Sequence, residues 1–126
     1  MVYTSYKRSI DINQSNLIMN QKVKVLTLKK NLNAQTSSEF QQAITVILES
    51  GAEIVLLDCQ NITFLDSSGL GTLVLAFKTL RDAGKKMVLC SINDQVRMIF
   101  ELTSMTEIFE IFPSKDEFNQ ILLAKN

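Results

Sequence analysis

The chain has 126 residues, the length of one domain. Its 13 basic and 13 acidic residues cancel, and 46% of its residues are hydrophobic, so the composition is that of an ordinary globular protein. The absence of histidine excludes Ser-His-Asp and Cys-His catalysis and every histidine-containing zinc site.

Cysteine usage and the lack of long apolar segments indicate a cytoplasmic protein. Cys59 and Cys90 are too few for a disulfide framework, and we expect two buried, reduced thiols. Further zinc ligands are lacking near them, so we expect no metal site. The first 20 residues contain no apolar run typical of a signal peptide, and no stretch reaches the roughly 18 apolar residues of a membrane span.

Charge is distributed unevenly along the chain. Residues 1–38 contain six basic residues and one acidic residue, a net charge of +5, and the rest of the chain carries −5. The lysines of the first part are scattered, without aromatic residues between them. This pattern favours a solvated surface, and we expect no nucleic-acid partner.

The first third of the chain predicts an extension followed by strands. We expect residues 1–14 to form a loosely ordered N-terminal extension and residues 15–126 to form the domain. A first strand is expected within residues 6–19. The alternation of Val23 and Val25 with lysines then predicts a half-buried strand.

A helix follows the second strand. Thr36 and Glu39 have the spacing of a capping box, and Gly51 stands where a helix would end. The expected inward-facing residues of this helix are Phe40, Ala43, Ile44, Ile47 and Leu48. The continuous apolar run 54–57 then predicts a strand that is covered on both faces.

Two further helices enclose another strand. Gly84 ends the second helix, residues 86–90 form the strand, and Asn93 or Asp94 caps the third helix. The expected inward residues of the two helices are Leu70, Leu73, Val74, Phe77, Leu80, Val96, Ile99, Phe100 and Leu102.

The C-terminal part predicts one more strand and one more helix. The strand covers residues 108–112 and stops at Pro113. Ser114 and Glu117 form a second capping box, and the expected inward residues of the last helix are Phe118, Ile121 and Leu122. This order of elements predicts one α/β domain, with a mixed sheet of about four to five strands, parallel at its centre, and about four helices.

The junction at residues 64–71 is the most informative part of the sequence. Asp66 follows the buried strand, and Ser67 and Ser68 stand at the start of the second helix. Gly69 and Gly71 leave room for a close approach to the helix backbone. Function in such sheets gathers where strands end and helices begin.

Several kinds of site compete for this junction. It lacks the lysine of a P-loop, the third glycine of a dinucleotide fingerprint and the Gly-x-Ser-x-Gly pattern of a nucleophile elbow. These absences disfavour a small enzyme or a nucleotide-binding protein. Two interpretations remain open: a helix cap made by Asp66 or Ser67, and a phosphorylation site on an exposed serine, where the helix dipole tolerates the added charge.

The stretch from Ile54 to Val74, which contains Asp-Ser-Ser-Gly-Leu-Gly, resembles the bacterial anti-sigma factor antagonists, which are stand-alone STAS domains. The resemblance continues through Gly84 and Phe100-Glu-Leu-Thr-Ser-Met and covers about residues 22–122. It implies a STAS-like fold and a regulatory protein with no catalytic residues and no cofactor.

The resemblance also implies a phosphorylation switch. In the family, the unphosphorylated domain binds an anti-sigma factor that is also a serine protein kinase, and so releases the sigma factor. That kinase phosphorylates the serine that corresponds to Ser67, which ends binding, and a PP2C-type serine phosphatase reverses the step. The matching positions that shape the phosphorylation site are Asp66, Ser68, Gly69 and Asn33.

The second helix would form the docking face for that partner. The candidate contacts are Leu70, Gly71, Val74, Lys78 and Arg81. The amphipathic helices show no second apolar face, so we expect a monomer.

One segment departs from the family pattern. Members usually have Gly-x-Leu-Asp before the first helix, and this chain has Lys30-Asn31-Leu32-Asn33. Asn33 lacks the charge of the aspartate, and Lys30 adds a positive charge. The change weakens repulsion of a nearby phosphate or signals another partner, so a STAS scaffold that acts on a kinase or phosphatase not tied to a sigma factor stays as the alternative.

Overall fold

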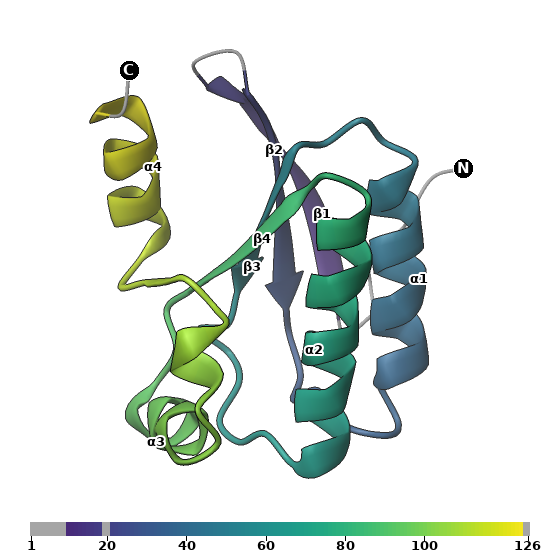
Figure 1. The fold of residues 1–126 in the computed structure, drawn as a ribbon, viewed down its shortest axis with the longest axis vertical. Coiled ribbons are helices and arrows are strands. Elements are labelled where there is room, and N and C mark those ends of the chain that lie inside the picture. The colour runs from purple at the N-terminus through teal and green to yellow at the C-terminus, as the bar shows by residue number, and fades with distance from the viewer. Residues whose placement is uncertain (1–9, 19–20, 125–126) are drawn as a thin grey trace.

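A five-stranded sheet forms the centre of the structure, a computed structural model that describes residues 10–18 and 21–124 (Figure 1). The strands follow one another across the sheet in chain order: β1 (Ile10–Ile18), β2 (Gln21–Leu28), β3 (Ile54–Asp58), β4 (Lys86–Cys90) and β5 (Ile111–Phe112). β1 is antiparallel to β2, and the pairs from β2 to β5 are parallel. The expected mixed α/β sheet with parallel central strands is therefore confirmed.

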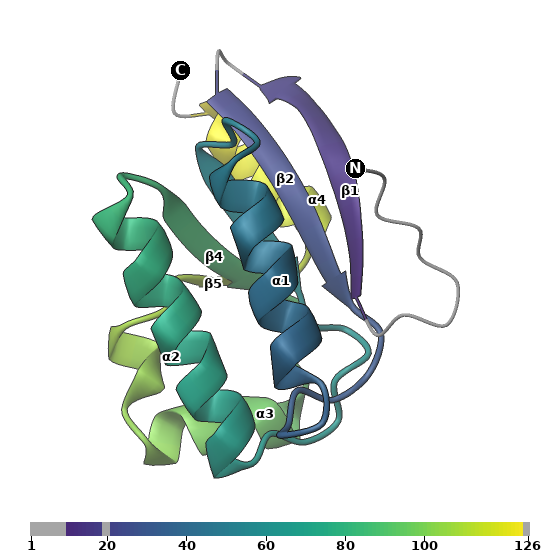
Figure 2. The same cartoon turned by 90° about the vertical axis from the view of Figure 1, so that its right-hand side faces the viewer.

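Helices cover both faces of the sheet. α1 (Ser37–Leu48) and α2 (Ser67–Asp82) lie side by side on one face, and α4 (Lys115–Ala124) lies on the other (Figures 1 and 2). α3 (Asp94–Leu102) and the short 3-10 helix η1 (Met105–Glu107) lie near the end of the sheet at which α2 begins. This end is therefore where the loop from β3 meets α2.

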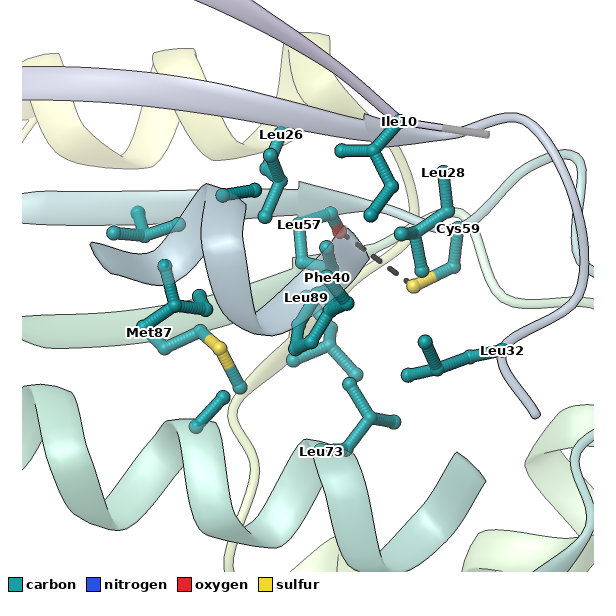
Figure 3. Packing of buried hydrophobic residues seen from close by; sticks show 14 of the residues in the cluster. Ile10, Leu26, Leu28, Leu32, Phe40, Leu57, Cys59, Leu73, Met87 and Leu89 are labelled. Atoms are coloured by element: carbon teal, nitrogen blue, oxygen red, sulfur yellow. Dashed lines mark hydrogen bonds between the residues drawn. The ribbon is translucent and has the colours of Figure 1, made fainter. Parts of the chain in front are cut away.

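The sheet separates two apolar clusters, which explains the continuous apolar run in β3. Leu57 packs with Phe40 of α1 and Leu73 of α2 on one face (Figure 3). Leu56 belongs to the cluster on the other face, together with Phe118 of α4. Alternate residues of β3 point to opposite faces of the sheet, and each β3 side chain is buried because helices cover both faces.

Both cysteines are buried and free, as expected. The Cys59 thiol donates to the Leu57 carbonyl oxygen at 3.7 Å (Figure 3). Burial raises the pKa of the Cys59 thiol well above its ordinary value, and the pKa of the Cys90 thiol is raised by the same cause. The thiols are therefore packing groups that hold their protons.

Three of the predicted helix signals form as expected, and one of the two hydrogen bonds of the second predicted capping box forms as well. Gly51 and Gly84 follow α1 and α2 with φ of +78° and +77°, a conformation that favours glycine. Asn93 caps α3, because its Oδ1 accepts from the Val96 N–H at 2.8 Å. In front of α4, the Ser114 hydroxyl oxygen accepts from the Glu117 backbone N–H at 3.1 Å.

The capping box predicted at Thr36 and Glu39 is wrong. Thr36 is the N-cap residue of α1, yet its side chain makes no capping hydrogen bond. Its hydroxyl donates to the Asn31 carbonyl oxygen at 2.9 Å and accepts from the Asn33 N–H at 3.0 Å. The preceding loop competes successfully for the hydroxyl.

Four other expectations need correction. Ile121, expected to face inward from the last helix, is 41% exposed on α4. Residues 10–14 of the expected loose extension pair with β2 as part of β1, and residues 1–9 lie outside the described part of the chain. The last strand begins at Ile111, not at residue 108, because the N–H groups of Ile108 and Phe109 bond to the Met105 carbonyl oxygen at the end of η1. Leu102 is 80% exposed at the end of α3, and Met98 of the same helix is 60% exposed. We expected a monomer because the helices would show no second apolar face, and these exposed side chains show that this reasoning fails for α3.

Candidate functional site

Ser67 is the first residue of α2, and its exposed side chain lies where the β3–α2 loop enters the helix. Asp66 is the N-cap residue, and its Oδ1 accepts from the Gly69 N–H at 2.8 Å. Ser68 is also exposed. The Ser67 hydroxyl makes no hydrogen bond within the described residues. The helix-cap interpretation thus accounts for Asp66 and leaves Ser67 accessible.

Close packing around Gly69 explains why the junction needs a glycine at this position. A Cβ atom on Gly69 would lie 1.9 Å from the Leu32 carbonyl oxygen and 2.8 Å from Leu65 Cδ1. The first turn of α2 therefore packs directly on the backbone that precedes α1. Gly71 differs, because a Cβ there would meet no atom within 4 Å.

The Lys30–Asn33 segment reaches the start of α2 through the Leu32 backbone. The Asn33 side chain instead forms a local turn, because its Oδ1 accepts from the Gln35 N–H at 2.9 Å and from the Thr36 N–H at 3.2 Å. Among the described residues, the Asn33 side chain makes no hydrogen bond to Ser67. The structure thus brings the segment, and not the Asn33 side chain, to the candidate site.

Asn31 is a site residue that sequence reasoning missed. Its Oδ1 accepts from the Thr63 N–H at 2.8 Å and from the Phe64 N–H at 3.4 Å, and its Nδ2 donates to the Thr63 hydroxyl at 3.2 Å. From the other side, Asn93 Nδ2 donates to the Ile62 carbonyl oxygen at 3.1 Å. Two asparagines that are distant in sequence therefore hold the loop before Asp66.

The five candidate docking residues of α2 differ in exposure. Gly71 and Lys78 are exposed, whereas Leu70 and Val74 are half-buried against the core. Arg81 is also exposed, and its guanidinium lies 3.5 Å from the carboxylate of the adjacent Asp82. The exposed residues are accessible to a partner, and the half-buried ones present only part of their side chains at the surface.

Asp58 is a second residue that the sequence did not single out. Its side chain is 1% exposed at the end of β3, and its Oδ1 accepts from the Gln60 N–H at 3.1 Å. Its Oδ2 has no hydrogen bond and lies 3.6 Å from Lys115 Nζ. This ion pair links the start of α4 to the sheet.

The described residues contain no group of three metal-ligating side chains that could hold an ion. Within the same part of the chain, no helix has both the length and the apolar character that crossing a membrane requires. The site therefore consists of a capped helix N-terminus, an exposed serine and a loop held by hydrogen bonds.

The fold and the site together are those of an α/β domain that carries an exposed serine at the start of a helix packed on its sheet. The family model of the STAS domain matches residues 14–118, and the chain belongs to this family. The anti-sigma-B factor antagonist of Listeria monocytogenes is 31% identical over 88 residues, which make up 70% of this chain and 77% of the relative.

Solved structures show the same fold. An anti-sigma factor antagonist from Mycobacterium paratuberculosis superimposes with a TM-score of 0.73 at 19% identity, over 90% of this chain and 94% of that one. The phosphorylated form of the Bacillus cell fate determinant SpoIIAA has a TM-score of 0.64 at 13% identity, over 89% and 99% of the two chains. The chain is thus a STAS domain of the anti-sigma factor antagonist family.

Proposed function

We propose that this protein is a phosphorylation-controlled antagonist of an anti-sigma factor. Its unphosphorylated form binds an anti-sigma factor that is also a serine protein kinase and thereby releases a sigma factor. The observation that carries the proposal is the exposed Ser67 at the first position of α2, beside a capping Asp66. The protein acts by binding and is not an enzyme.

Phosphorylation would change charge at this site without breaking the fold. The kinase transfers the γ-phosphoryl group of ATP to Ser67 Oγ, and the hydroxyl proton is lost. The new group carries close to two negative charges, which a helix N-terminus tolerates. Asp66 already supplies one carboxylate there. A partner that docks on α2 would then meet about three negative charges at one point, and binding would end.

The proposal assigns roles to the surrounding residues. Asp66, Ser68 and Gly69 shape the phosphorylation site, and Asn33 fixes the turn that directly follows the Leu32 carbonyl. The partner-binding residues are Leu70, Gly71, Val74, Lys78 and Arg81. A PP2C-type serine phosphatase removes the phosphate. The protein works in the cytoplasm, without nucleic acid or membrane. We propose that it is a monomer although Met98 and Leu102 of α3 are exposed, and light scattering tests this, since a dimer would contradict it.

Phosphopeptide mapping of protein purified from its native cells tests the proposal. We expect phosphate on Ser67 in part of the population, and a kinase that co-purifies with Ser67→Ala but not with Ser67→Asp. Ser68→Ala and Ser68→Asp serve as matched controls. Equal recovery of the kinase with both Ser67 variants, or a Ser67 that stays bare in growth, stress and starvation, contradicts the proposal.

The second candidate is a partner-switching STAS scaffold for a kinase or phosphatase not tied to a sigma factor. The Lys30–Asn33 segment favours it, because it packs on the start of α2 through the Leu32 carbonyl and carries an exposed Lys30 and an uncharged Asn33. Purification of Ser67→Ala with a kinase or phosphatase that binds no sigma factor would support this candidate.

A further inference from the structure

Phe64 is an exposed aromatic residue three positions before Ser67. Its side chain is 55% exposed, although the neighbouring Leu65 is 3% exposed. Residues 60–72 are all described, and Phe64 is the exposed large apolar side chain among them. Single exposed apolar side chains are common on protein surfaces, so what distinguishes Phe64 is its position on the loop that leads directly into the candidate site.

The backbone that carries Phe64 is held in place before any partner binds. Asn31 Oδ1 accepts from the N–H groups of Thr63 and Phe64, and Asn93 Nδ2 donates to the Ile62 carbonyl oxygen. Leu65 and the Asp66 cap fix the following residues. A partner would therefore lose little conformational entropy in ordering this loop.

We propose that Phe64 is the apolar anchor by which the anti-sigma factor kinase binds this protein, and that Asn31 positions it. This inference rests on the proposed function, because the same partner reads Ser67. The exposed residues at the start of α2 are small or polar: Asp66, Ser67, Ser68 and Gly71. Such residues give specificity and little hydrophobic burial, whereas an aromatic ring in a partner pocket is typical of a binding hot spot.

The partner must therefore present two features next to each other. One is an apolar pocket for the Phe64 ring, and the other is the polar site that receives the Ser67 hydroxyl. The anchor and the phosphorylated residue lie on one short, continuous segment that runs into α2. Phosphorylation would then place its charge beside a dry, apolar contact, where repulsion is least screened.

The test measures affinity for the purified kinase that phosphorylates Ser67 in the native cells. Phe64→Ala should weaken its binding at least about thirty-fold. Ile121→Ala is the matched control, because Ile121 is 41% exposed on α4, on the far face of the sheet, and should bind like wild type. In the phosphorylation reaction, Phe64→Ala should raise KM and leave kcat unchanged, since the ring supplies binding energy and has no group that takes part in the transfer.

A double-mutant cycle tests the role of Asn31. Asn31→Ala should weaken binding in the wild-type background and have no further effect in the Phe64→Ala background, because Asn31 acts through Phe64. Circular dichroism of each variant checks that the fold is intact. Wild-type affinity of Phe64→Ala overturns the inference and leaves the proposed function standing. Failure to find any kinase for Ser67 overturns both.

Discussion

Replacing Gly69 by alanine tests the contact that joins α2 to the segment before α1. The added Cβ would lie 1.9 Å from the Leu32 carbonyl oxygen, about 1.5 Å closer than the nearest ordinary contact. The Leu32 carbonyl belongs to the backbone, so it cannot turn away as the end of a flexible side chain would. The helix or the loop must move.

The expected cost combines two opposing effects. Forcing a methyl group into a packed contact costs about 3 kcal/mol when backbone has to shift. Alanine in place of glycine inside a helix returns about 1 kcal/mol. We therefore expect Gly69→Ala to lower the free energy of unfolding by about 2 kcal/mol, which corresponds to a Tm lower by about 8 °C in a domain of this size.

Urea denaturation and thermal unfolding measure this change, and the same helix offers a control. A Cβ on Gly71 meets nothing within 4 Å, so Gly71→Ala should raise the free energy of unfolding by up to about 1 kcal/mol. The two alanine variants should therefore differ by about 3 kcal/mol. If Gly69→Ala is as stable as wild type, the close approach of the Leu32 carbonyl is not a feature of the folded protein.

Three further predictions concern stability. Burial raises the pKa of Cys59, so the folded state favours the neutral thiol. The stability that this thiol contributes should be full below its unfolded pKa of about 8.5 and should fall as the pH rises above that value. Urea midpoints at about pH 7 and about pH 9.5 measure the fall, and Cys59→Ala should make it smaller. Lys115→Ala removes the cation that faces the buried Asp58 carboxylate and should lower the free energy of unfolding by about 1–3 kcal/mol. Lys115→Arg keeps a cation and should lower it less. Equal urea midpoints for wild type and Lys115→Ala would contradict the role of this ion pair. Asn93→Ala should cost about 1–2 kcal/mol, because it removes both the cap of α3 and the hydrogen bond to the β3–α2 loop; an unchanged Tm would count against both contacts.

Local sequence signals predicted the elements well where the cause was itself local. Gly51 and Gly84 end their helices because the chain must take a positive φ there. The Asn93 cap depends on a backbone N–H three residues away. The Thr36 prediction failed because residues of the preceding loop took the hydroxyl, and this competition cannot be seen in the spacing of Thr36 and Glu39.

The residues of the candidate site were also predictable only where a local motif marked them. Asp66 and Ser67 follow from a short motif at a predicted helix start. Asn31 and the Leu32 carbonyl belong to the same site through contacts that span 32 to 37 positions, and periodicity carries no information about such pairs. The exposure of Leu102 was also missed, because a helical stripe predicts which side faces inward but not where the core ends.

The hydrogen bonds of Asn31 to the β3–α2 loop have a consequence for what an enzyme can recognise. A peptide that contains residues 60–72 has the whole motif around the proposed phosphorylation site, yet it lacks the Asn31 side chain that holds Thr63 and Phe64. The surface that we propose a kinase recognises is therefore a conformational epitope, which is complete only once β2 and β3 have paired. A kinase that reads this surface would ignore nascent or unfolded copies, and the phosphorylated fraction would count only antagonist molecules that are competent to bind.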